Sequence, residues 1–178
     1  MITETKIFGG KKIIIREFSK KDVKNAKAFL DFINSFVDED AMLSINKKKT
    51  LGEEKDWLRH TAAEKKERVY LLAECDGKIV AAADIGVLRG RQSHIGEFGI
   101  TVREGYRGIG LGEYIMRKTI NLARKRLTIK IIQLKVFTNN KPANGLYKKM
   151  GFRKIASIPH ALQYKGRLMS EYLMFLYL

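Results

Sequence analysis

The chain has 178 residues, of which 45% are hydrophobic and 30% are charged, and its formal net charge is +16. This size and composition predict one soluble globular domain over residues 1–178 and exclude global disorder. No apolar run reaches the length that spans a bilayer, and the N-terminus lacks the layout of a secretion signal, so we expect a cytoplasmic protein without a membrane partner.

Hydrophobic periodicity and turn residues predict alternating strands and helices along the chain. In chain order, the expected elements are a strand at Lys12–Arg16, a helix at Lys20–Phe36, a helix from Thr50 through Leu58, strands at Arg68–Glu74, Lys78–Val87 and His94–Val102, a helix at Leu111–Arg126, a strand at Lys130–Phe137, a helix at Pro142–Met150, and strands at Phe152–Ser157 and Met169–Tyr177. The order βααβββαβαββ predicts an α/β fold with mixed strand pairing.

Three local signals mark the ends of these elements. Asp76-Gly77, between two strands, is a strong hairpin signal. Thr50 and Glu53 form a capping box at a helix start. Ser19 and Asp22 give a looser signal of the same kind, because a capping box has Glu or Gln at its last position.

The most informative segment is Arg107-Gly108-Ile109-Gly110-Leu111-Gly112, which follows a predicted strand and opens a predicted helix. Alternate glycines let the backbone approach a ligand and adopt positive φ angles. The first N–H groups of a helix are unpaired and carry the positive end of its dipole. The segment therefore predicts a cradle for an anion, usually a phosphate.

Two common phosphate loops do not fit this segment. A dinucleotide fingerprint requires G-x-G-x-x-G, and its last position holds Glu113 or Ile115, depending on the starting glycine. A Walker A loop requires lysine after its second glycine, and Leu111 stands there. Dinucleotide-binding, kinase and NTPase functions are therefore disfavoured.

The positive charge is concentrated in the half of the chain that holds the cradle. Residues 1–90 carry 18 basic and 15 acidic side chains, whereas residues 91–178 carry 17 basic and only 4 acidic ones. Such a field concentrates polyanions near the site. A nucleotide cofactor, RNA or an acidic substrate would account for it, and so would a lysine-rich solvated surface.

No pattern of ligands predicts a metal site. Cys75 is the only cysteine and falls in an apolar strand, so we expect it to be structural. The histidines and acidic residues show no metal-ligand spacing. We therefore expect neither a disulfide framework nor a metal cofactor.

Two motifs resemble those of the GNAT family of N-acetyltransferases. The first is the family's acyl-CoA loop, Q/R-x-x-G-x-G/A, matched by Arg107, Gly110 and Gly112. The second, N-x-x-A-x-x-L-Y-x-x-x-G-F, is similar to the segment from Asn140 to Phe152. The resemblance covers about the whole chain, weakly before residue 70 and strongly over 94–152. It implies an α+β fold with a mixed, strongly twisted central sheet flanked by helices.

The resemblance implies acetyl-CoA as co-substrate and a primary amine as acceptor, with direct attack and no covalent enzyme intermediate. Loop N–H groups would hold the pyrophosphate, and the pantetheine arm would pair as a pseudo-strand with a strand that splays from its neighbour. Gly96 and Gly99 in that strand suggest a β-bulge or a close approach. The residues implied in cofactor binding are Ile100, Thr101, Val102, Arg107, Gly108, Ile109, Gly110, Leu111, Gly112, Asn140, Asn144 and Tyr147. An N-cap is the alternative role for Asn140.

The implied reaction requires an acid for the departing thiolate and a base for the amine. Tyr147 stands where the family places its tyrosine acid, and a phenol with a pKa of about 10 suits a thiol with one of about 8.5. A core tyrosine is the alternative. Glu97 is the candidate base, directly or through water, and its alternative is a solvent-facing carboxylate paired with a basic side chain. His94 is a second candidate base.

Glu39, Asp40 and Glu171 are candidates for binding a cationic acceptor, because family members often place the first helix pair over the acceptor site. The acceptor would be a protein α-amino or lysine amine, including a ribosomal one, or a small molecule such as a polyamine or an amino acid. The basic half favours association with RNA or the ribosome, and a homodimer stays open. The alternative function is a catalytically inactive RNA-binding or CoA-sensing module that uses the basic C-terminal half.

Overall fold

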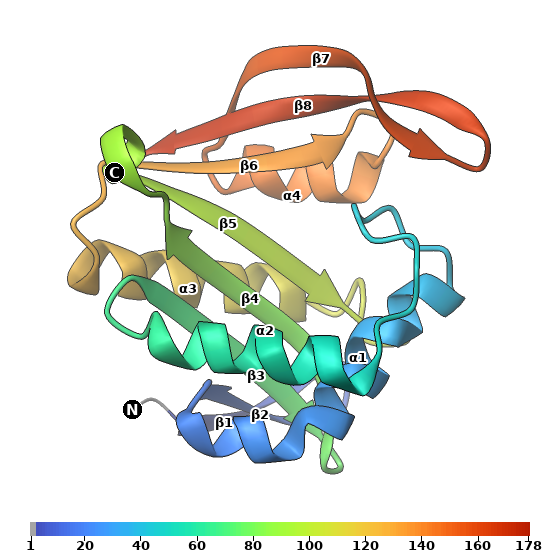
Figure 1. The fold of residues 1–178 in the computed structure, drawn as a ribbon, viewed down its shortest axis with the longest axis vertical. Helices are drawn as coiled ribbons and strands as arrows, with labels where there is room; N and C mark the ends of the chain where they lie inside the picture. Colours follow the sequence, from blue (N-terminus) through green and yellow to red (C-terminus); the bar gives the residue numbers. More distant parts are fainter. Residues whose placement is uncertain (1–2) are drawn as a thin grey trace.

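One mixed sheet organises residues 3–178, which are the residues that the computed structural model describes (Figure 1). Its strands are β1 (Thr3–Phe8), β2 (Lys11–Glu17), β3 (Arg68–Cys75), β4 (Lys78–Val87), β5 (Ile95–Val102), β6 (Ile131–Phe137), β7 (Arg153–Tyr164) and β8 (Arg167–Tyr177). The helices are α1 (Ala26–Asp38), α2 (Leu51–Ala63), α3 (Leu111–Arg126) and α4 (Lys141–Lys149), with short 3-10 helices η1 (Lys20–Asn25) and η2 (Gly90–Gln92).

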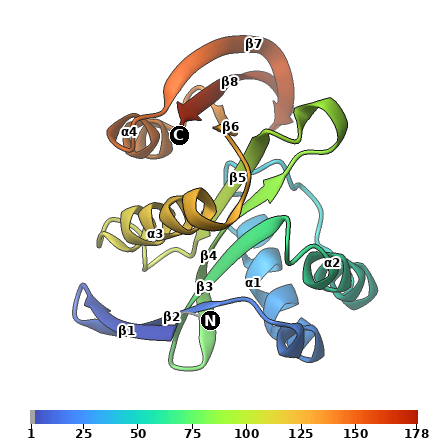
Figure 2. The ribbon, with the colours of Figure 1, turned by 90° about the vertical axis from the view of Figure 1, so that its left-hand side faces the viewer.

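The strands lie in the order β1-β2-β3-β4-β5-β6-β8-β7, and only the neighbours β5 and β6 are parallel in the described part of the chain. A parallel pair needs a long crossover, which α3 supplies. Figure 2 shows α1 and α2 on one side of the sheet and α3 and α4 on the other. This arrangement confirms the predicted mixed sheet flanked by helices. No helix within residues 3–178 is long and apolar enough to cross a membrane.

Each face of the sheet carries its own apolar core. Beneath α1 and α2, the core includes Phe29, Phe32, Phe36 and Leu58. On the opposite face, α3 packs against β3, β4 and β5 with one buried stripe at helical spacing, which contains Leu111, Ile115, Met116 and Ile120. The buried stripe begins at the first residue of α3, so packing against the sheet positions the helix N-terminus.

The fold begins with a hairpin that the expected element order lacks. β1 and β2 pair antiparallel from Thr3↔Arg16 to Phe8↔Lys11, and the glycines of the turn Gly9-Gly10 have φ angles of 53° and 76°. Consecutive residues with positive φ are typical of two-residue hairpin turns, so the Gly-Gly dipeptide is the sequence feature that could have indicated this hairpin. The sequence pattern did not predict β1, because this edge strand has mostly exposed side chains and therefore little apolar alternation.

The predicted hairpin turn and the capping box are confirmed. Asp76 and Gly77 have φ angles of 49° and 73°, as a type I′ turn requires. The Thr50 N–H donates to Glu53 Oε2 at 2.7 Å, and the Glu53 N–H donates to Thr50 Oγ1 at 3.3 Å. These contacts define the sharp start of α2.

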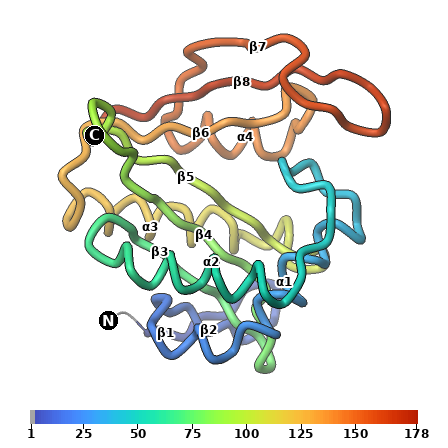
Figure 3. Tube along the Cα trace, viewed as in Figure 1, coloured from blue at the N-terminus to red at the C-terminus, as the bar shows by residue number. Residues whose placement is uncertain are grey.

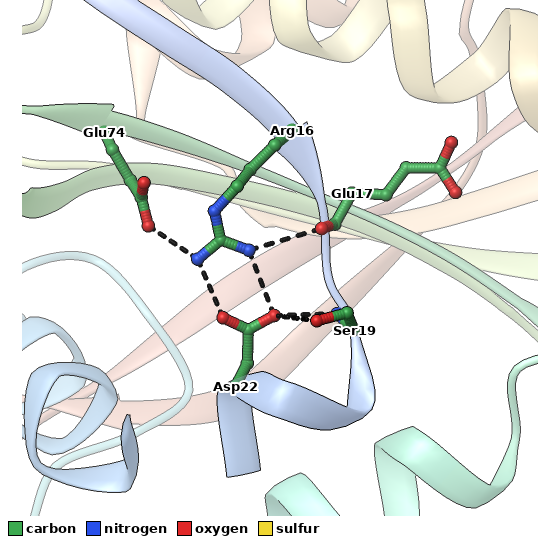
Figure 4. Close-up of polar contacts among 5 residues, drawn as sticks. All are labelled: Arg16, Glu17, Ser19, Asp22 and Glu74. Carbon is green, nitrogen blue, oxygen red and sulfur yellow. Dashed lines mark hydrogen bonds and ion pairs between the residues drawn. The ribbon is translucent and has the colours of Figure 1, made fainter. Parts of the chain in front are cut away.

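Asp22 caps the first helical segment and also ties it to the sheet (Figure 4). Its carboxylate accepts from the Ser19 N–H at 2.7 Å and from the two terminal nitrogens of Arg16 at 2.7 and 3.0 Å. Arg16 also pairs with Glu74 of β3 at 2.6 Å. This arginine explains why Asp serves where Glu or Gln is usual. The helix expected over Lys20–Phe36 is divided between Asn25 and Ala26 into η1 and α1.

The β7–β8 hairpin is longer than the sequence indicated. The segment 158–168, expected between the last two strands, is mostly strand, and the turn is confined to Lys165-Gly166, with φ angles of 50° and 71°. Two register shifts, at 154–156 and 158–162, interrupt the alternation of side chains along β7. Such irregularities hide a strand from an analysis based on period-two patterns.

Candidate functional site

The parallel pair in the middle of the sheet separates part-way along its length. β5 and β6 pair only as far as Glu97↔Gln133, and the two strands then diverge (Figure 3). Past this point, β6 no longer pairs with the β5 edge that faces it, which leaves N–H and C=O groups available to an extended ligand. The residues predicted to pair with the pantetheine arm, Ile100, Thr101 and Val102, lie in this part of β5 and are half-buried.

The glycines of β5 allow side chains of β4 to approach its backbone closely. The β-bulge that the glycines suggested is absent, because the register between β4 and β5 is continuous. A Cβ on Gly99 would lie 3.0 Å from Oδ1 of Asp84. A Cβ on Gly96 would lie 2.6 Å from Cγ2 of Ile85. The glycines therefore let side chains of β4 lie close over the backbone of β5.

The glycine-rich loop between β5 and α3 presents a row of backbone donors. Gly105, Gly108 and Gly110 have φ angles of 79°, 74° and 86°, and a Cβ on any of them would meet no atom within 4 Å. Within residues 3–178, the backbone N–H groups from Arg107 to Glu113 have no hydrogen-bond acceptor. Unpaired donors in open space at the positive end of α3 are the requirement for binding an anion.

The N-terminal hairpin supports this loop. A Cβ on Gly9 would lie 2.8 Å from Cγ2 of Ile109, so glycine lets the hairpin turn approach the loop. Phe8 packs edge-on against Tyr114 of α3, with ring centroids 5.5 Å apart. The strand that the sequence analysis missed therefore helps to position the predicted phosphate cradle.

The Arg107 side chain links two segments that border the site. Its Nε donates to the Val102 carbonyl at 2.7 Å, and its Nη2 pairs with Glu39 Oε1 at 2.7 Å. Val102 ends β5 and Glu39 follows α1, so one guanidinium joins the end of the splayed strand to the first helix. The loop N–H of Arg107 is independent of these side-chain contacts.

Asn140 and Asn144 organise the start of α4. Oδ1 of Asn140 accepts from the Ala143 N–H at 3.3 Å, which is an N-cap. Nδ2 of Asn144 donates to the carbonyls of Phe137 at 3.0 Å and Asn140 at 2.8 Å. Oδ1 of Asn144 is buried without a hydrogen-bond partner in the described part of the chain. The Asn140 amide caps α4 and the Asn144 amide fastens α4 to the end of β6, and contact of either with a cofactor stays a prediction.

Tyr147 packs beneath the point where β5 leaves β6. Its ring contacts Phe98 of β5 and Phe152, with centroids 6.4 and 6.1 Å away, and 8% of the residue is exposed. Its hydroxyl makes no hydrogen bond to a residue that the structure describes. Burial raises the pKa of Tyr147 to about 12, because the phenolate would lose its hydration, so the ordinary value assumed from sequence is corrected. The hydroxyl is thus a protonated donor throughout the neutral range.

Glu97 and His94 occupy different positions along the same strand. Glu97 is exposed, is the last residue of β5 paired with β6, and forms no ion pair within residues 3–178. His94 precedes β5, and its carbonyl accepts from the N–H groups of Lys130 and Ile131 at 2.8 and 3.3 Å. Glu97 therefore lies where the strands diverge, whereas His94 lies toward the paired end.

The three carboxylates predicted to bind the acceptor all have basic partners. Glu39 pairs with Arg107, as described above. Asp40 pairs with Lys165 at 3.1 Å, and Glu171, buried in β8, lies 3.8 Å from Lys135. The Asp40 carbonyl also accepts from the Tyr164 hydroxyl at 2.8 Å, which brings the β7–β8 turn against the α1–α2 loop. These carboxylates help to join the walls of the site, and a role in binding the acceptor stays a prediction.

A cavity of about 160 Å³ lies between α1, α2 and strands β3 to β5, and the sequence analysis did not indicate it. Its lining includes four aromatic side chains and two carboxylates, namely Phe29, Phe32, Trp57, Tyr70, Glu54 and Asp84. The β5 segment 99–101 forms another part of the wall. The sequence feature that could have indicated this cavity is Asp84, the one charged residue in the apolar run Ile79–Val87.

Both carboxylates of the cavity are affected by burial. Burial raises the pKa of Glu54, which is 3% exposed, and the Lys49 ammonium lies 3.5 Å from its Oε2. Burial raises the pKa of Asp84 to about 6, even though Arg68 pairs with it. Desolvation disfavours the charged form more than the guanidinium favours it. No group of three His, Cys, Asp or Glu side chains that could hold a metal ion occurs among residues 3–178.

Comparison with known proteins identifies relatives of one kind. The profile of the Acetyltransferase (GNAT) family matches residues 34–152. L-amino acid N-acetyltransferase AaaT of Escherichia coli (strain K12) is 39% identical over 83 residues, which are 46% of this chain and 51% of AaaT, so the chain spans about half the length of this relative.

Solved structures match over most of the chain. The acetyltransferase of the GNAT family from Streptococcus pneumoniae superposes with a TM-score of 0.82 and 29% identity, over 93% of this chain and 99% of that one. The Salmonella typhimurium protein yncA, solved with its cofactor acetyl-CoA, superposes with a TM-score of 0.79 and 20% identity, over 93% of each chain. At that identity, the likeness to yncA shows the fold alone.

Proposed function

Because this chain belongs to the acetyltransferase (GNAT) family, we propose that it transfers an acetyl group from acetyl-CoA to a primary amine. One observation carries the proposal: a strand with a free edge leads directly into a row of unpaired N–H donors, Arg107–Glu113. The donors suit a pyrophosphate, and the free edge suits an arm that bears amides. The two features follow one another along the chain, as the two parts of one CoA molecule do.

The residues of the site then divide into distinct roles. The N–H groups of the loop hold the pyrophosphate, and the backbone of Ile100–Val102 pairs with the arm. This pairing places the thioester beside the point where β5 and β6 diverge. There the partner-free hydroxyl of Tyr147 donates to the sulfur as the thiolate departs. The fixed backbone donors contribute mainly by holding the thioester in one orientation.

The acceptor is proposed to be a small primary amine, with an amino acid as the first candidate. A cavity of about 160 Å³ whose lining includes four aromatic side chains accommodates one small substituent and has no room for a folded protein segment. The relative AaaT is named for acetylating L-amino acids. A free α-amino group at the end of a peptide is the second candidate, since its first side chain would enter the same cavity.

The distribution of charge in the fold supports an enzyme over an RNA-binding module. Several cations of the basic half are neutralised by carboxylates of the first half, in the pairs Arg107–Glu39, Lys118–Glu4, Arg126–Glu17 and Lys165–Asp40. Part of the excess positive charge is therefore used inside the fold. Binding of RNA or the ribosome stays a separate prediction.

Titration with acetyl-CoA, followed by a screen of amines, tests the proposal. Calorimetry should detect binding, and acetyl-CoA at about 100 times its Kd should stabilise the fold by roughly 2.7 kcal/mol. Acetyl-pantetheine, which lacks the pyrophosphate, should bind more weakly because it leaves the N–H row unused. The screen should include amino acids, polyamines and short peptides, and it should record thiol release and product mass. Absence of binding to acetyl-CoA would overturn the proposal.

A further inference from the structure

Asp84 lies where the cavity meets the free part of β5. It is paired across the sheet with Gly99, and its Oδ1 lies 3.0 Å from the position that a Cβ on Gly99 would take. Gly99 immediately precedes Ile100, the first residue proposed to face the pantetheine arm. The carboxylate therefore stands over the strand next to the expected position of the thioester.

The two oxygens of this carboxylate have different surroundings. Oδ2 accepts from Nη1 of Arg68, which holds the group in one orientation. Oδ1 has no hydrogen-bond partner among residues 3–178 and is not sealed from solvent. With 24% of the Asp84 side chain exposed, Oδ1 is left open toward the cavity that the residue lines.

We infer that Asp84, through Oδ1, takes a proton from the ammonium of the acceptor, and that the aromatic cavity holds the acceptor's apolar substituent. This inference rests on the proposed function. It differs from the sequence-based prediction for Glu97, which lies two positions before Gly99 on β5 and is exposed. The acceptor class is thus a primary ammonium on a small apolar or aromatic body.

The cavity walls suit such an acceptor. Phe29, Phe32, Trp57 and Tyr70 offer apolar surface and ring faces, which attract both hydrocarbon and cations. The second carboxylate, Glu54, already faces the Lys49 ammonium. Glu54 is also only 3% exposed, whereas the Asp84 side chain is 24% exposed, so the free oxygen of Asp84 is the accessible acceptor for an incoming N–H. In a partly dry cavity, the attraction between the ammonium and this carboxylate is stronger than in water.

The proposed step moves one proton from the acceptor to Asp84 before the C–N bond forms. The ammonium gives one proton to Oδ1 of Asp84 and becomes a neutral amine, whose lone pair forms a bond to the thioester carbonyl carbon. The electron pair displaced onto the carbonyl oxygen returns as the C–S bond breaks, and the sulfur leaves as a thiolate. The nitrogen loses its second proton, the thiolate gains one, and Asp84 releases the first proton to water. The products are an amide, CoA thiol and one proton.

Titration of Asp84 depends on charges from each element packed around it. The groups that act on it are Arg68 of β3, Glu97 of β5 and Glu64 after α2, with Tyr70 of β3 and Glu54 of α2 in the same cavity wall. The carboxylates and the burial favour the protonated form, and Arg68 opposes them. A pKa of about 6 makes this carboxylate a better proton acceptor for an α-amino group, with its pKa of about 8, than an ordinary one.

The test compares Asp84→Asn with the wild-type chain over pH 5–10, using an accepted amine from the screen. At pH 7 we expect kcat/KM of Asp84→Asn to fall about 10²-fold or more, with the Kd for acetyl-CoA within twofold of wild type. The loss should shrink at high pH, and it should shrink for amines of low pKa, because those amines are already neutral. A purely structural role would give neither rescue.

Asp56→Asn is the matched control, because it makes the same substitution at an exposed carboxylate outside the site, and its profile should match wild type. Glu97→Gln is the competing variant. If Glu97→Gln shows the loss that high pH rescues and Asp84→Asn does not, the inference is wrong. An active wild type with an unchanged Asp84→Asn profile overturns the inference alone. A wild type that binds acetyl-CoA but acetylates no amine overturns the proposed function as well.

A second variant keeps the test decisive if Asp84→Asn fails to fold. Gly99→Ala places a methyl group 3.0 Å from Oδ1 and displaces the free oxygen without removing the carboxylate. We expect it to reproduce the fall in kcat/KM and the rescue by low-pKa amines. A folded Gly99→Ala enzyme with wild-type kinetics would show that the position of Oδ1 is irrelevant.

Discussion

Arg107 and Glu39 are separated by 68 positions in the chain, yet Nη2 of the arginine lies 2.7 Å from Oε1 of the glutamate. The contact joins the glycine-rich loop to the end of α1, and the same guanidinium holds the Val102 carbonyl. The proposed cofactor side and the proposed acceptor side therefore share one anchor. Because Glu39 is paired with Arg107, we expect it to support the glycine-rich loop more than to bind the acceptor.

Glu39→Gln should weaken the binding of acetyl-CoA more than the binding of the acceptor. The carboxylate is already paired, so its loss loosens the loop without removing a free charge from the acceptor path. We expect Kd for acetyl-CoA to rise about two- to fivefold, acceptor KM to change less than twofold, and stability to change by less than about 1 kcal/mol. Calorimetry and steady-state kinetics measure these values. A tenfold rise in acceptor KM alone would instead support the sequence-based role in acceptor binding.

Gly110→Val should abolish binding of acetyl-CoA in a folded protein. Gly110 has a φ angle of 86°, which a β-branched residue adopts only with strain of about 1–3 kcal/mol, and the added methyl groups would enter the space over the N–H row. Gly90→Val is the control, since Gly90 also has positive φ and open surroundings but lies in η2, before the opposite end of β5. It should lose similar stability and keep its affinity. Equal affinity for the two variants would contradict the cradle.

Tyr147→Phe should lower kcat about 10- to 100-fold and leave the Kd for acetyl-CoA within twofold. The hydroxyl has no hydrogen-bond partner among residues 3–178, so its removal should change the free energy of unfolding by less than about 1 kcal/mol. Because the pKa of Tyr147 is raised to about 12, the wild-type profile should show no basic limb from this group below that pH. Single-turnover kinetics check the first point. An unchanged kcat would leave Tyr147 as a core tyrosine.

Asp84→Asn should become more stable relative to wild type as the pH rises from 4 to 7. The pKa of Asp84 is about 6 in the fold, against about 3.9 for an unfolded chain, so its stabilising effect is complete below pH 4 and is lost as the pH passes 6. The loss approaches about 3 kcal/mol, and asparagine does not titrate. Urea unfolding at pH 4, 5.5 and 7 measures the difference. A difference independent of pH would show that burial does not shift this group.

Local signals predicted much of the fold because they act over a few residues. The turn at Asp76-Gly77 and the capping box of Thr50 and Glu53 are decided by backbone conformation and short-range hydrogen bonds. The sequence pattern did not predict β1, because an exposed edge strand lacks apolar alternation. It missed most of β7 because the register shifts in that strand break the alternation.

Long-range contacts were the part of the site that sequence patterns did not supply. The motifs located the loop and Tyr147, since both depend on residue types at fixed spacing. They did not reveal that Arg107 binds Glu39, or that Asp84 lies over Gly99. Each of these contacts joins elements that meet only after the sheet has assembled.

Sequence patterns alone predicted the GNAT family, the order of nearly all the elements and the place of a glycine-rich loop at the start of a helix. These depend on glycines, caps and periodicity, which are properties of short segments. The three-dimensional packing set the point, Glu97, after which β5 and β6 separate, the burial of Tyr147 and the cavity that ends at Asp84. Burial and strand divergence are set by packing between distant segments, and the resulting desolvation raises the pKa of Asp84 and of Tyr147.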